Sequence, residues 1–374
     1  MSMPVNPITL VRPKLIEFGA GTVSKVGEWA GTFFKRVLIV TDSFNMQRVE
    51  LLTIPGDVTV FPNVRPEPDL TNLAALVAVA EALQPDLVIG FGGGSAMDLA
   101  KLAAVLPGSG RQFADIVGIE RVAGKRSALV QVPTTAGTGS EAGTRALVTD
   151  PITQNKLAVQ SNHMLADLAV IDPELMLTLP SQVTAATGVD AMAHCVEAFT
   201  SRRSNPVIDL YALEGIKLVG EYLPRAVADG DDIEARTALS LASLYGGYCL
   251  GPVNTTAGHA VAYPLGTRHH IAHGAANALV FPHTLAFNTP AVPEKTAAVL
   301  AALGFPGQSQ TDVFEGAYEF CVTLGCKMRL SELGVPRNDL GVMADEAYAI
   351  RRLLDNNPRD LPRDQILALY EAAY

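Results

Sequence analysis

The sequence lacks the features that mark secreted, membrane and nucleic-acid-binding proteins. It has only four cysteines in 374 residues, none in a CxxC spacing, so we expect free thiols in a reducing cytoplasm. No run of 18 residues is free of both charge and proline, and the first residues hold no apolar signal-peptide core, so we expect neither a transmembrane helix nor a secretory signal. Basic residues are the minority, and a net charge of −10 argues against nucleic acid and anionic membranes as partners.

Apolar residues are plentiful, at 48% of the chain, which is enough for sizeable cores. A length of 374 residues favours two domains. β-rich and helical segments alternate in the first part of the chain, and helical composition dominates after about residue 180. We therefore expect an α/β domain with a mostly parallel, Rossmann-like sheet over residues 1–180 and an all-α domain over 181–374. The strands expected are 36–42, 57–64, the first parts of 86–106 and 127–141, 145–150 and 168–175; the helices expected are 70–84, the second part of 86–106, 237–250, 292–304, 311–325 and a terminal helix.

A glycine-rich turn, Gly92–Ser95, lies between an apolar strand and a helix. Glycines let a phosphate approach the backbone, and a helix N-terminus supplies free N–H groups. The stretch only approximates the GxGxxG fingerprint, so an ordinary tight turn is the alternative. Its position after a strand favours a pyrophosphate site.

Two further strand ends carry candidate cofactor groups. The run Pro133–Ser140 holds four small hydroxyl side chains and two glycines, which suits a polar ligand that touches the backbone, although a plain Thr/Ser-rich turn has the same composition. Asp42 ends the first strand, where an acid can accept both ribose hydroxyls of an adenosine and would repel a 2′-phosphate. A helix cap or a solvated loop acid is the alternative for Asp42.

A candidate metal site begins in the segment after Pro180, which reads as a helix with Ser181 as its N-cap. Asp190 and His194 are four residues apart and therefore share one helix face. A carboxylate and an imidazole on one face form half of a divalent-metal site, although such a pair is more often simply solvated.

His259 and His273 could supply the other half of this site. Each lies in a Gly- and Ala-rich stretch that is poor in charge. A lone histidine in an apolar run is usually a satisfied core residue. Buried polar groups need partners, however, and a metal ion is one such partner.

Several motifs together resemble the iron-containing (group III) alcohol dehydrogenase family. They are IGFGGGSAMD, PTTAGTGSE, GVDAMAHCVEAFTS, GHAVAYPLGTRHHIAHGAANALVFPH and the NPR of the tail, and the resemblance runs nearly end to end. It implies a dinucleotide-binding α/β domain followed by a helical metal-binding domain, an architecture shared broadly with dehydroquinate synthases. The boundary near residue 180 agrees with that organisation.

The resemblance also implies roles for individual residues and for the cofactors. It implies Fe²⁺ as the metal, with Zn²⁺ as a possible substitute because His/Asp ligation does not single out iron. It implies NAD, with NADP less favoured because of Asp42. The implied metal ligands are Asp190, His194, His259 and His273; the implied cofactor-binding residues are Asp42, Gly92, Gly93, Gly94, Ser95, Asp98, Thr134, Thr135, Thr138 and Lys156.

The sequence departs from the family at Tyr263. Many members carry a second histidine four residues after the third ligand, whereas this chain has AYPLG there. A tyrosine hydroxyl, with an ordinary pKa near 10, is a poorer proton shuttle at neutral pH than imidazole. Because Tyr263 occupies the position of that histidine, it is nevertheless the candidate proton relay. His269 and His270, on a nearby loop, are further candidates.

These observations predict a metal-dependent, NAD-linked alcohol dehydrogenase that moves hydride between a primary alcohol or aldehyde and the nicotinamide. The resemblance suggests a homodimer and a small-molecule substrate. A maleylacetate reductase-like or transhydrogenase-like enzyme, acting on a hydroxy acid or oxo acid, is the alternative within the same fold. A non-catalytic nucleotide-binding protein is the alternative from another class.

Overall fold

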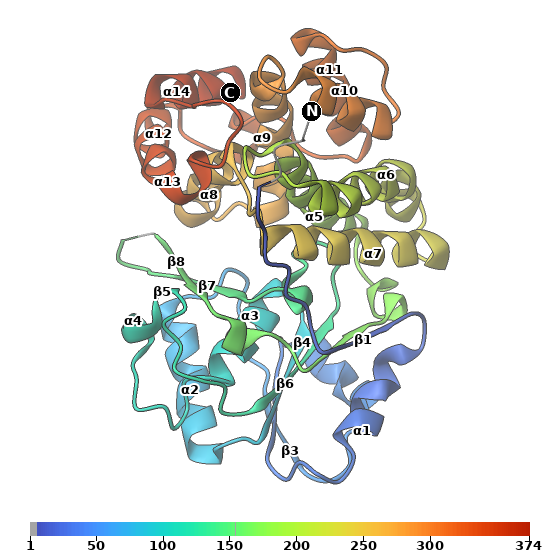
Figure 1. Cartoon of the computed structure of the whole chain (residues 1–374), viewed down its shortest axis with the longest axis vertical. Helices are drawn as coiled ribbons and strands as arrows, with labels where there is room; N and C mark the ends of the chain where they lie inside the picture. The colour runs from blue at the N-terminus through green and yellow to red at the C-terminus, as the bar shows by residue number, and fades with distance from the viewer. Residues whose placement is uncertain (1–5, 154) are drawn as a thin grey trace. The chain divides into compact units, whose positions relative to one another are not determined.

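The computed structural model describes residues 6–153 and 155–374, and the chain divides into two compact units (Figure 1). Residues 11–135 and 139–177 form an α/β unit. The remaining residues form a helical unit. The sequence predicts a cofactor-binding domain over residues 1–180 and a metal-binding domain over 181–374. This assignment stays a prediction.

A six-stranded sheet is the centre of the α/β unit, and its paired strands all run parallel. Its order is β1-β9-β6-β4-β2-β3. The predicted α/β class with a mostly parallel sheet is thereby confirmed. The strands are β1 (Leu15–Phe18), β2 (Val37–Val40), β3 (Val58–Phe61), β4 (Leu87–Gly92), β6 (Ala128–Pro133) and β9 (Leu168–Ile171).

Strand β2 shows why these segments form a buried sheet. All four of its side chains are buried, as expected for a strand with both faces covered. Leu38 and Val40 pack into a cluster with α2 and α3, whereas Val37 and Ile39 point to the other face and pack with α1. Figure 1 shows these helices around the sheet. The helices of this unit are α1 (Lys25–Ala30), α2 (Leu70–Leu83), α3 (Gly94–Ala103) and α4 (Phe113–Ile116).

A second, three-stranded sheet has the order β5-β8-β7. The strand expected at 145–150 is present as β7, but it lies in this small sheet and not in the main one. It pairs antiparallel with β8, which follows it after a short connection, and a short connection cannot make the crossover that a parallel pair needs. The strands are β5 (Gly118–Ile119), β7 (Arg145–Thr149) and β8 (Lys156–Gln160).

The strand expected at 168–175 is shorter than predicted. β9 ends at Ile171, and a 3-10 helix, Pro173–Met176, follows it. Asp172 causes the change of direction, because its side chain accepts a hydrogen bond from the Glu174 N–H at 3.0 Å.

The helical unit contains residues 6–10, the segment Ala136–Thr138 and residues Thr178–Tyr374. Helices α5, α6 and α7 pack against one another, α9 packs against α5, and α8, α9, α12 and α14 share one apolar core. The five helices expected in this part of the chain, including the one after Pro180, are all present, with ends moved by about a turn or less. The helices are α5 (Ser181–Thr200), α6 (Pro206–Ala228), α7 (Ile233–Leu250), α8 (Ala257–His269), α9 (His273–Asn288), α10 (Pro293–Ala302), α11 (Gln310–Thr323), α12 (Leu340–Ala349), α13 (Arg351–Leu354) and α14 (Arg363–Ala372).

The predicted N-cap of α5 is wrong by one residue. Pro180 occupies the cap position, with φ −57° and ψ 147°, and Ser181 is already helical. No side chain caps this helix, because a helical Ser181 cannot turn its hydroxyl back onto the first turn. Among the residues that the structure describes, no helix is long and apolar enough to cross a membrane.

Candidate active site

The turn between β4 and α3 is shaped for close approach of a ligand to the backbone. Gly92 has φ 155°, and a Cβ there would lie 2.9 Å from the Cβ of Ala96 and 3.2 Å from Oδ2 of Asp42. Gly93 is the N-cap of α3, and no side chain caps the helix. The helix therefore presents its first N–H groups and the positive end of its dipole at this turn.

A hydrogen-bond network beside this turn connects three strand ends through Asp42, Asn45 and Thr134. Asp42 accepts hydrogen bonds from the N–H of Phe44 and of Asn45, each 2.9 Å long, and from the Asn45 amide at 2.8 Å. That amide also reaches Thr134 Oγ1 at 3.3 Å, and the Thr134 N–H donates to the Gly92 carbonyl at 3.0 Å. The predicted residues Asp42, Gly92 and Thr134 thus lie together at the carboxyl ends of β2, β4 and β6.

Thr135 lies next to this group. A Cβ on Gly93 would be 3.5 Å from Thr135 Oγ1, so the threonine hydroxyl borders the turn. Gly94 and Ser95 are the first two residues of α3. All of these positions were predicted to bind the cofactor, and the fold of the α/β unit gathers them at one edge of the sheet.

Three other predicted cofactor residues have local partners or lie elsewhere. Asp98 accepts a 2.6 Å hydrogen bond from Ser140 and a 2.9 Å bond from the N–H of Leu147, so it fixes the loop that leads into β7. Lys156, on β8, forms an ion pair with Glu67. Thr138 belongs to the short segment that is part of the helical unit.

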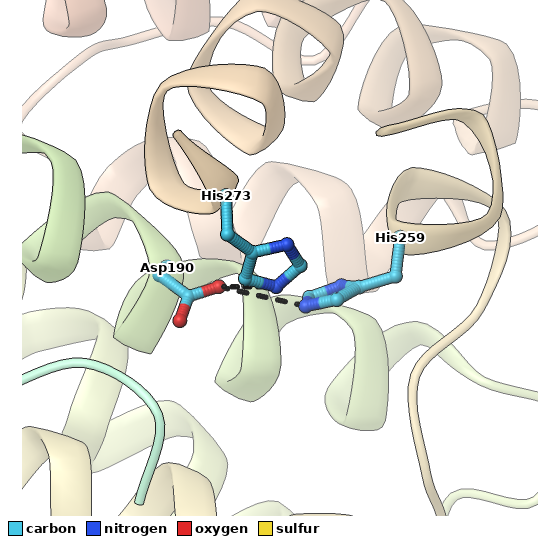
Figure 2. Close-up of side chains that lie close together, drawn as sticks. All are labelled: Asp190, His259 and His273. Carbon is cyan, nitrogen blue, oxygen red and sulfur yellow. Dashed lines mark ion pairs between the residues drawn. The ribbon is translucent and has the colours of Figure 1, made fainter. Parts of the chain in front are cut away.

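The predicted metal ligands converge within the helical unit. Asp190 Oδ1 is 3.8 Å from Nε2 of His194, 3.5 Å from Nε2 of His259 and 3.4 Å from Nε2 of His273. Asp190 and His194 come from α5, His259 from the first turn of α8, and His273 is the first residue of α9. Figure 2 shows Asp190, His259 and His273 pointing toward one another.

These separations fit a divalent ion. Ligand atoms around a tetrahedral ion with bonds of about 2.1 Å stand about 3.4 Å apart. The three tightest candidates, Asp190, His259 and His273, have ligand atoms that all lie within 4.8 Å of one another. His194 lies outside that group but stacks on His259, with ring centroids 4.8 Å apart, and its buried Nδ1 has no hydrogen-bond partner among the residues that the structure describes. His273 is the accessible member, since 24% of its side chain is exposed, against 6% or less for the other three.

The negative charge of Asp190 also favours binding of a cation in this cluster. Burial opposes ionisation of Asp190, but the imidazoles of His194, His273 and His259 outweigh it and hold the pKa of Asp190 well below its usual range. Burial lowers the pKa of His194, and the charge of Asp190 opposes this only in part. Burial would also lower the pKa of His259, but Glu197 and Asp190 raise it to about 10. The cluster thus holds a carboxylate that shares a proton with an imidazole, and a metal ion would replace that proton.

Two polar residues that touch the ligands were not predicted from the sequence. Glu197 Oε1 is 2.5 Å from His259 Nδ1, and the Asn277 amide nitrogen is 2.7 Å from Asp190 Oδ1. Helical spacing places each beside a ligand, since Glu197 follows His194 by three residues and Asn277 follows His273 by four, but it does not show which group each side chain contacts.

Of the three predicted proton-relay residues, the structure brings only Tyr263 close to the ligands. Its ring centroid is 6.3 Å from that of His259 and 5.9 Å from that of His273. His269 lies at the end of α8, about 15 Å along the helix from His259, and pairs with Asp339 at 3.5 Å. His270 ends α8 in a left-handed conformation, with φ 55°.

Comparison with known proteins identifies the family. Residues 13–173 match the family described as iron-containing alcohol dehydrogenase, and residues 184–374 match its C-terminal part, the Fe-containing alcohol dehydrogenase family, C-terminal. The chain belongs to the iron-containing alcohol dehydrogenase family. It is therefore an oxidoreductase that acts on alcohols and aldehydes, as the sequence predicted.

Relatives of this chain cover nearly its whole length. Long-chain-alcohol dehydrogenase 1 of Geobacillus thermodenitrificans is 35% identical, over 98% of this chain and 96% of its own. The structure of an alcohol dehydrogenase from Oenococcus oeni has a TM-score of 0.93 and 31% identity, covering 98% of this chain and 100% of that one. A sulfoacetaldehyde reductase from Bifidobacterium kashiwanohense, solved in complex with NAD⁺, has a TM-score of 0.88 and 28% identity, with 98% of each chain covered.

Proposed function

We propose that the protein is a metal-dependent, NAD-linked alcohol dehydrogenase or aldehyde reductase for small primary alcohols and aldehydes. The observation that carries this proposal is the convergence of three imidazole Nε2 atoms on Asp190 Oδ1 at 3.4 to 3.8 Å. The ligand set we propose is Asp190, His194, His259 and His273. Fe²⁺ is the metal that the family name suggests, and Zn²⁺ would fit the same donors.

When bound, a divalent ion supplies Lewis-acid polarisation of the alcohol or carbonyl oxygen, and NAD supplies the hydride acceptor. The protein contributes position and charge. Asp190 provides the negative charge of the site, and the low pKa of its carboxyl group keeps it ionised across the working pH range. His273, the exposed member of the ligand set, lies where a substrate can approach.

For the nicotinamide nucleotide we propose the turn at Gly92–Ser95, with Thr134, Thr135 and Asp42 beside it. The complex of the related sulfoacetaldehyde reductase with NAD⁺ supports NAD as the cofactor. Asp42 supports a preference for NAD over NADP, since its carboxylate would repel a 2′-phosphate. We propose Asp98, Thr138 and Lys156 as further contacts of the bound cofactor.

Tyr263 is the residue that we propose to relay the alcohol proton, because its ring lies beside His259 and His273. His269 and His270 remain proposals for the same role near the end of α8. A homodimer and a cytoplasmic location also remain predictions, which sedimentation and cell fractionation would check.

Reconstitution with a defined metal tests the function. The protein is stripped with a chelator and loaded anaerobically with Fe²⁺ or Zn²⁺, and NADH formation is followed with short alcohols and diols. We expect turnover that depends on the metal and on NAD. His273→Ala and Asp190→Ala should abolish turnover and metal retention while NADH still binds, whereas His163→Ala, at an exposed histidine of the α/β unit, should change neither. Full activity in either ligand variant would overturn the metal assignment. Turnover confined to hydroxy acids would favour the alternative substrate class.

A further inference from the structure

Glu197 is a buried carboxylate on α5 with partners on both oxygens. Its Oε1 lies 2.5 Å from Nδ1 of His259. Its Oε2 accepts hydrogen bonds from the Thr256 N–H at 2.5 Å, the Thr256 hydroxyl at 2.9 Å and the His259 N–H at 3.4 Å. One side chain therefore holds both the imidazole of His259 and the backbone at the start of α8.

The chain leaves room for this carboxylate at Gly258. A Cβ on Gly258 would lie 2.7 Å from Oε1 of Glu197 and 3.0 Å from its Cδ. Any larger residue would push the carboxylate away from His259. The N-cap residue of α8 is Thr256, whose side chain does not cap the helix. Glu197 lies at this positive end of the helix dipole and supplies negative charge there.

The donors around Glu197 decide which nitrogen of His259 carries a proton. Three donor groups face Oε2, so Oε1 is the oxygen left for the imidazole, and Nδ1 must donate to it. When a metal ion displaces the proton shared with Asp190, the neutral ring keeps its other proton on Nδ1 and offers Nε2 as an electron-pair donor. That atom faces Asp190, 3.5 Å away.

We propose that Glu197 is a positioning residue of the metal site, which fixes the ring of His259 and selects the tautomer that can bind a metal through Nε2. The inference rests on the metal site proposed above. The carboxylate also makes the imidazole a stronger donor, because its charge stabilises the partial positive charge that the ring acquires on coordination. Partners of this kind typically contribute about 10- to 100-fold in metal affinity.

Glu197→Gln is the most informative variant because it keeps the size of the side chain. An amide has one acceptor oxygen and one donor nitrogen. If the oxygen stays toward Thr256, the NH₂ group faces Nδ1 and forces the proton of His259 onto Nε2, where it blocks coordination. If the oxygen turns toward His259, the NH₂ group meets the donors of Thr256. Either arrangement weakens the site.

The matched control is Thr256→Val, which removes the hydroxyl donor to Oε2 and leaves the bond between Oε1 and Nδ1. The Kd for Zn²⁺ alone is measured by competition with a chromophoric chelator, and Tm of the metal-free proteins is measured in parallel. We expect Glu197→Gln to raise the Kd about 10- to 100-fold. Thr256→Val should lower Tm and change the Kd less than about 3-fold, since it leaves the imidazole contact in place.

Four outcomes would overturn the proposal, the last of them measured on a replacement variant. If Glu197→Gln and wild type bind Zn²⁺ with equal affinity, Glu197 acts only as a helix cap. The same conclusion follows if Thr256→Val loses as much Zn²⁺ affinity as Glu197→Gln does. Absence of Zn²⁺ binding in wild type itself, matching Asp190→Ala, would remove the proposed metal site and the role of Glu197 with it. If Glu197→Gln does not fold, Glu197→Asp replaces it. The shorter carboxylate keeps the charge and retreats from Nδ1, so we expect an intermediate loss of affinity, and an unchanged Kd would count against the proposal.

Discussion

The amide nitrogen of Asn277 lies 2.7 Å from Oδ1 of Asp190, the oxygen on which the imidazoles converge. The same nitrogen is 3.3 Å from Nε2 of His259 and 3.3 Å from Nε2 of His273. In the metal-free protein this amide donates to the buried carboxylate alongside the proton that His259 shares with it. A metal ion bound by the same atoms would take over that task.

Asn277→Ala should therefore destabilise the metal-free protein more than the metal-loaded protein. Loss of this donor removes one of the hydrogen bonds that a buried carboxylate oxygen accepts, at a cost of about 1–3 kcal/mol. We expect Zn²⁺ to raise Tm by more in this variant than in wild type, as measured by thermal unfolding with and without the metal. Asn288→Ala removes a buried amide that pairs with Asn357, and it should lower Tm equally in both states. An equal loss in both states for Asn277→Ala would contradict the argument.

Asp42 should determine the choice between NAD and NADP. Its carboxylate also fixes the turn after β2, through the N–H groups of Phe44 and Asn45. Asp42→Ser keeps a side-chain acceptor for that turn and removes the charge. We expect the ratio of kcat/KM for NAD to that for NADP to fall at least about 10-fold, which corresponds to about 1.4 kcal/mol.

Asp42→Ala is the companion to Asp42→Ser. It should change cofactor preference in the same direction and cost about 1 kcal/mol more in stability, because the turn loses its acceptor. An unchanged preference in both variants would show that Asp42 serves the turn alone.

The inner strands of the main sheet and about half of the helices could be predicted because their patterns are local. Val37–Val40 is a short run of β-branched and aliphatic residues, and Leu70–Leu83 is rich in Ala and Leu, so propensity and structure agree. Strands β1 and β8 were not predicted. Each has only four or five residues and a mixed composition, and it is pairing with β9 or β7 that makes each of them a strand.

The candidate metal site was predictable in its ligands but not in the groups that support them. Helical spacing alone identifies Asp190 and His194 as a pair. His259 and His273 meet only because α8 ends at His269 and α9 starts four residues later. Glu197 looks in the sequence like an ordinary helix residue, because its partner is 62 positions away. Contacts of that range depend on packing, which no local pattern reports.

Glu141 should make the α/β unit less stable as the pH rises. Its carboxyl is buried, with Oε2 lacking a hydrogen-bond partner, and burial raises the pKa of Glu141 from 4.5 to about 7. The folded protein therefore binds a proton that the unfolded chain releases between these values. The stabilisation is complete below about pH 4.5 and is lost as the pH rises toward 7, a change of about 3 kcal/mol.

Urea unfolding at pH 5 and pH 8 measures this effect. The fluorescence of Trp29, the single tryptophan, reports on the α/β unit in which it lies. Glu141→Gln should be more stable than wild type at pH 8 and should gain little at pH 5. Glu50→Gln, at an exposed glutamate of the same unit, should follow wild type at both pH values. A pH dependence in Glu141→Gln identical to that of wild type would contradict the assignment.

Tyr263 should act through its hydroxyl and not through its ring. The ring lies beside His259 and His273, and the guanidinium of Arg352 stands 5.7 Å from its centroid. Tyr263→Phe keeps these ring contacts and removes only the hydroxyl. If the hydroxyl relays the alcohol proton, kcat should fall about 10²- to 10⁴-fold, while metal content and the KM for NAD stay the same.

Tyr263→His separates a proton relay from a structural role. Imidazole, with an ordinary pKa near 6.5, exchanges protons at neutral pH far more readily than a phenol with a pKa near 10. We expect this variant to retain or exceed wild-type kcat at pH 7 and to reach its maximum at lower pH than wild type. Profiles of kcat over pH 6–10 make the comparison. A Phe variant with full kcat, or a His variant with the wild-type profile, would exclude Tyr263 as the relay. The Phe variant would also show whether the ring alone maintains the geometry of the two histidines, since any loss of metal in that variant would place Tyr263 among the supports of the site.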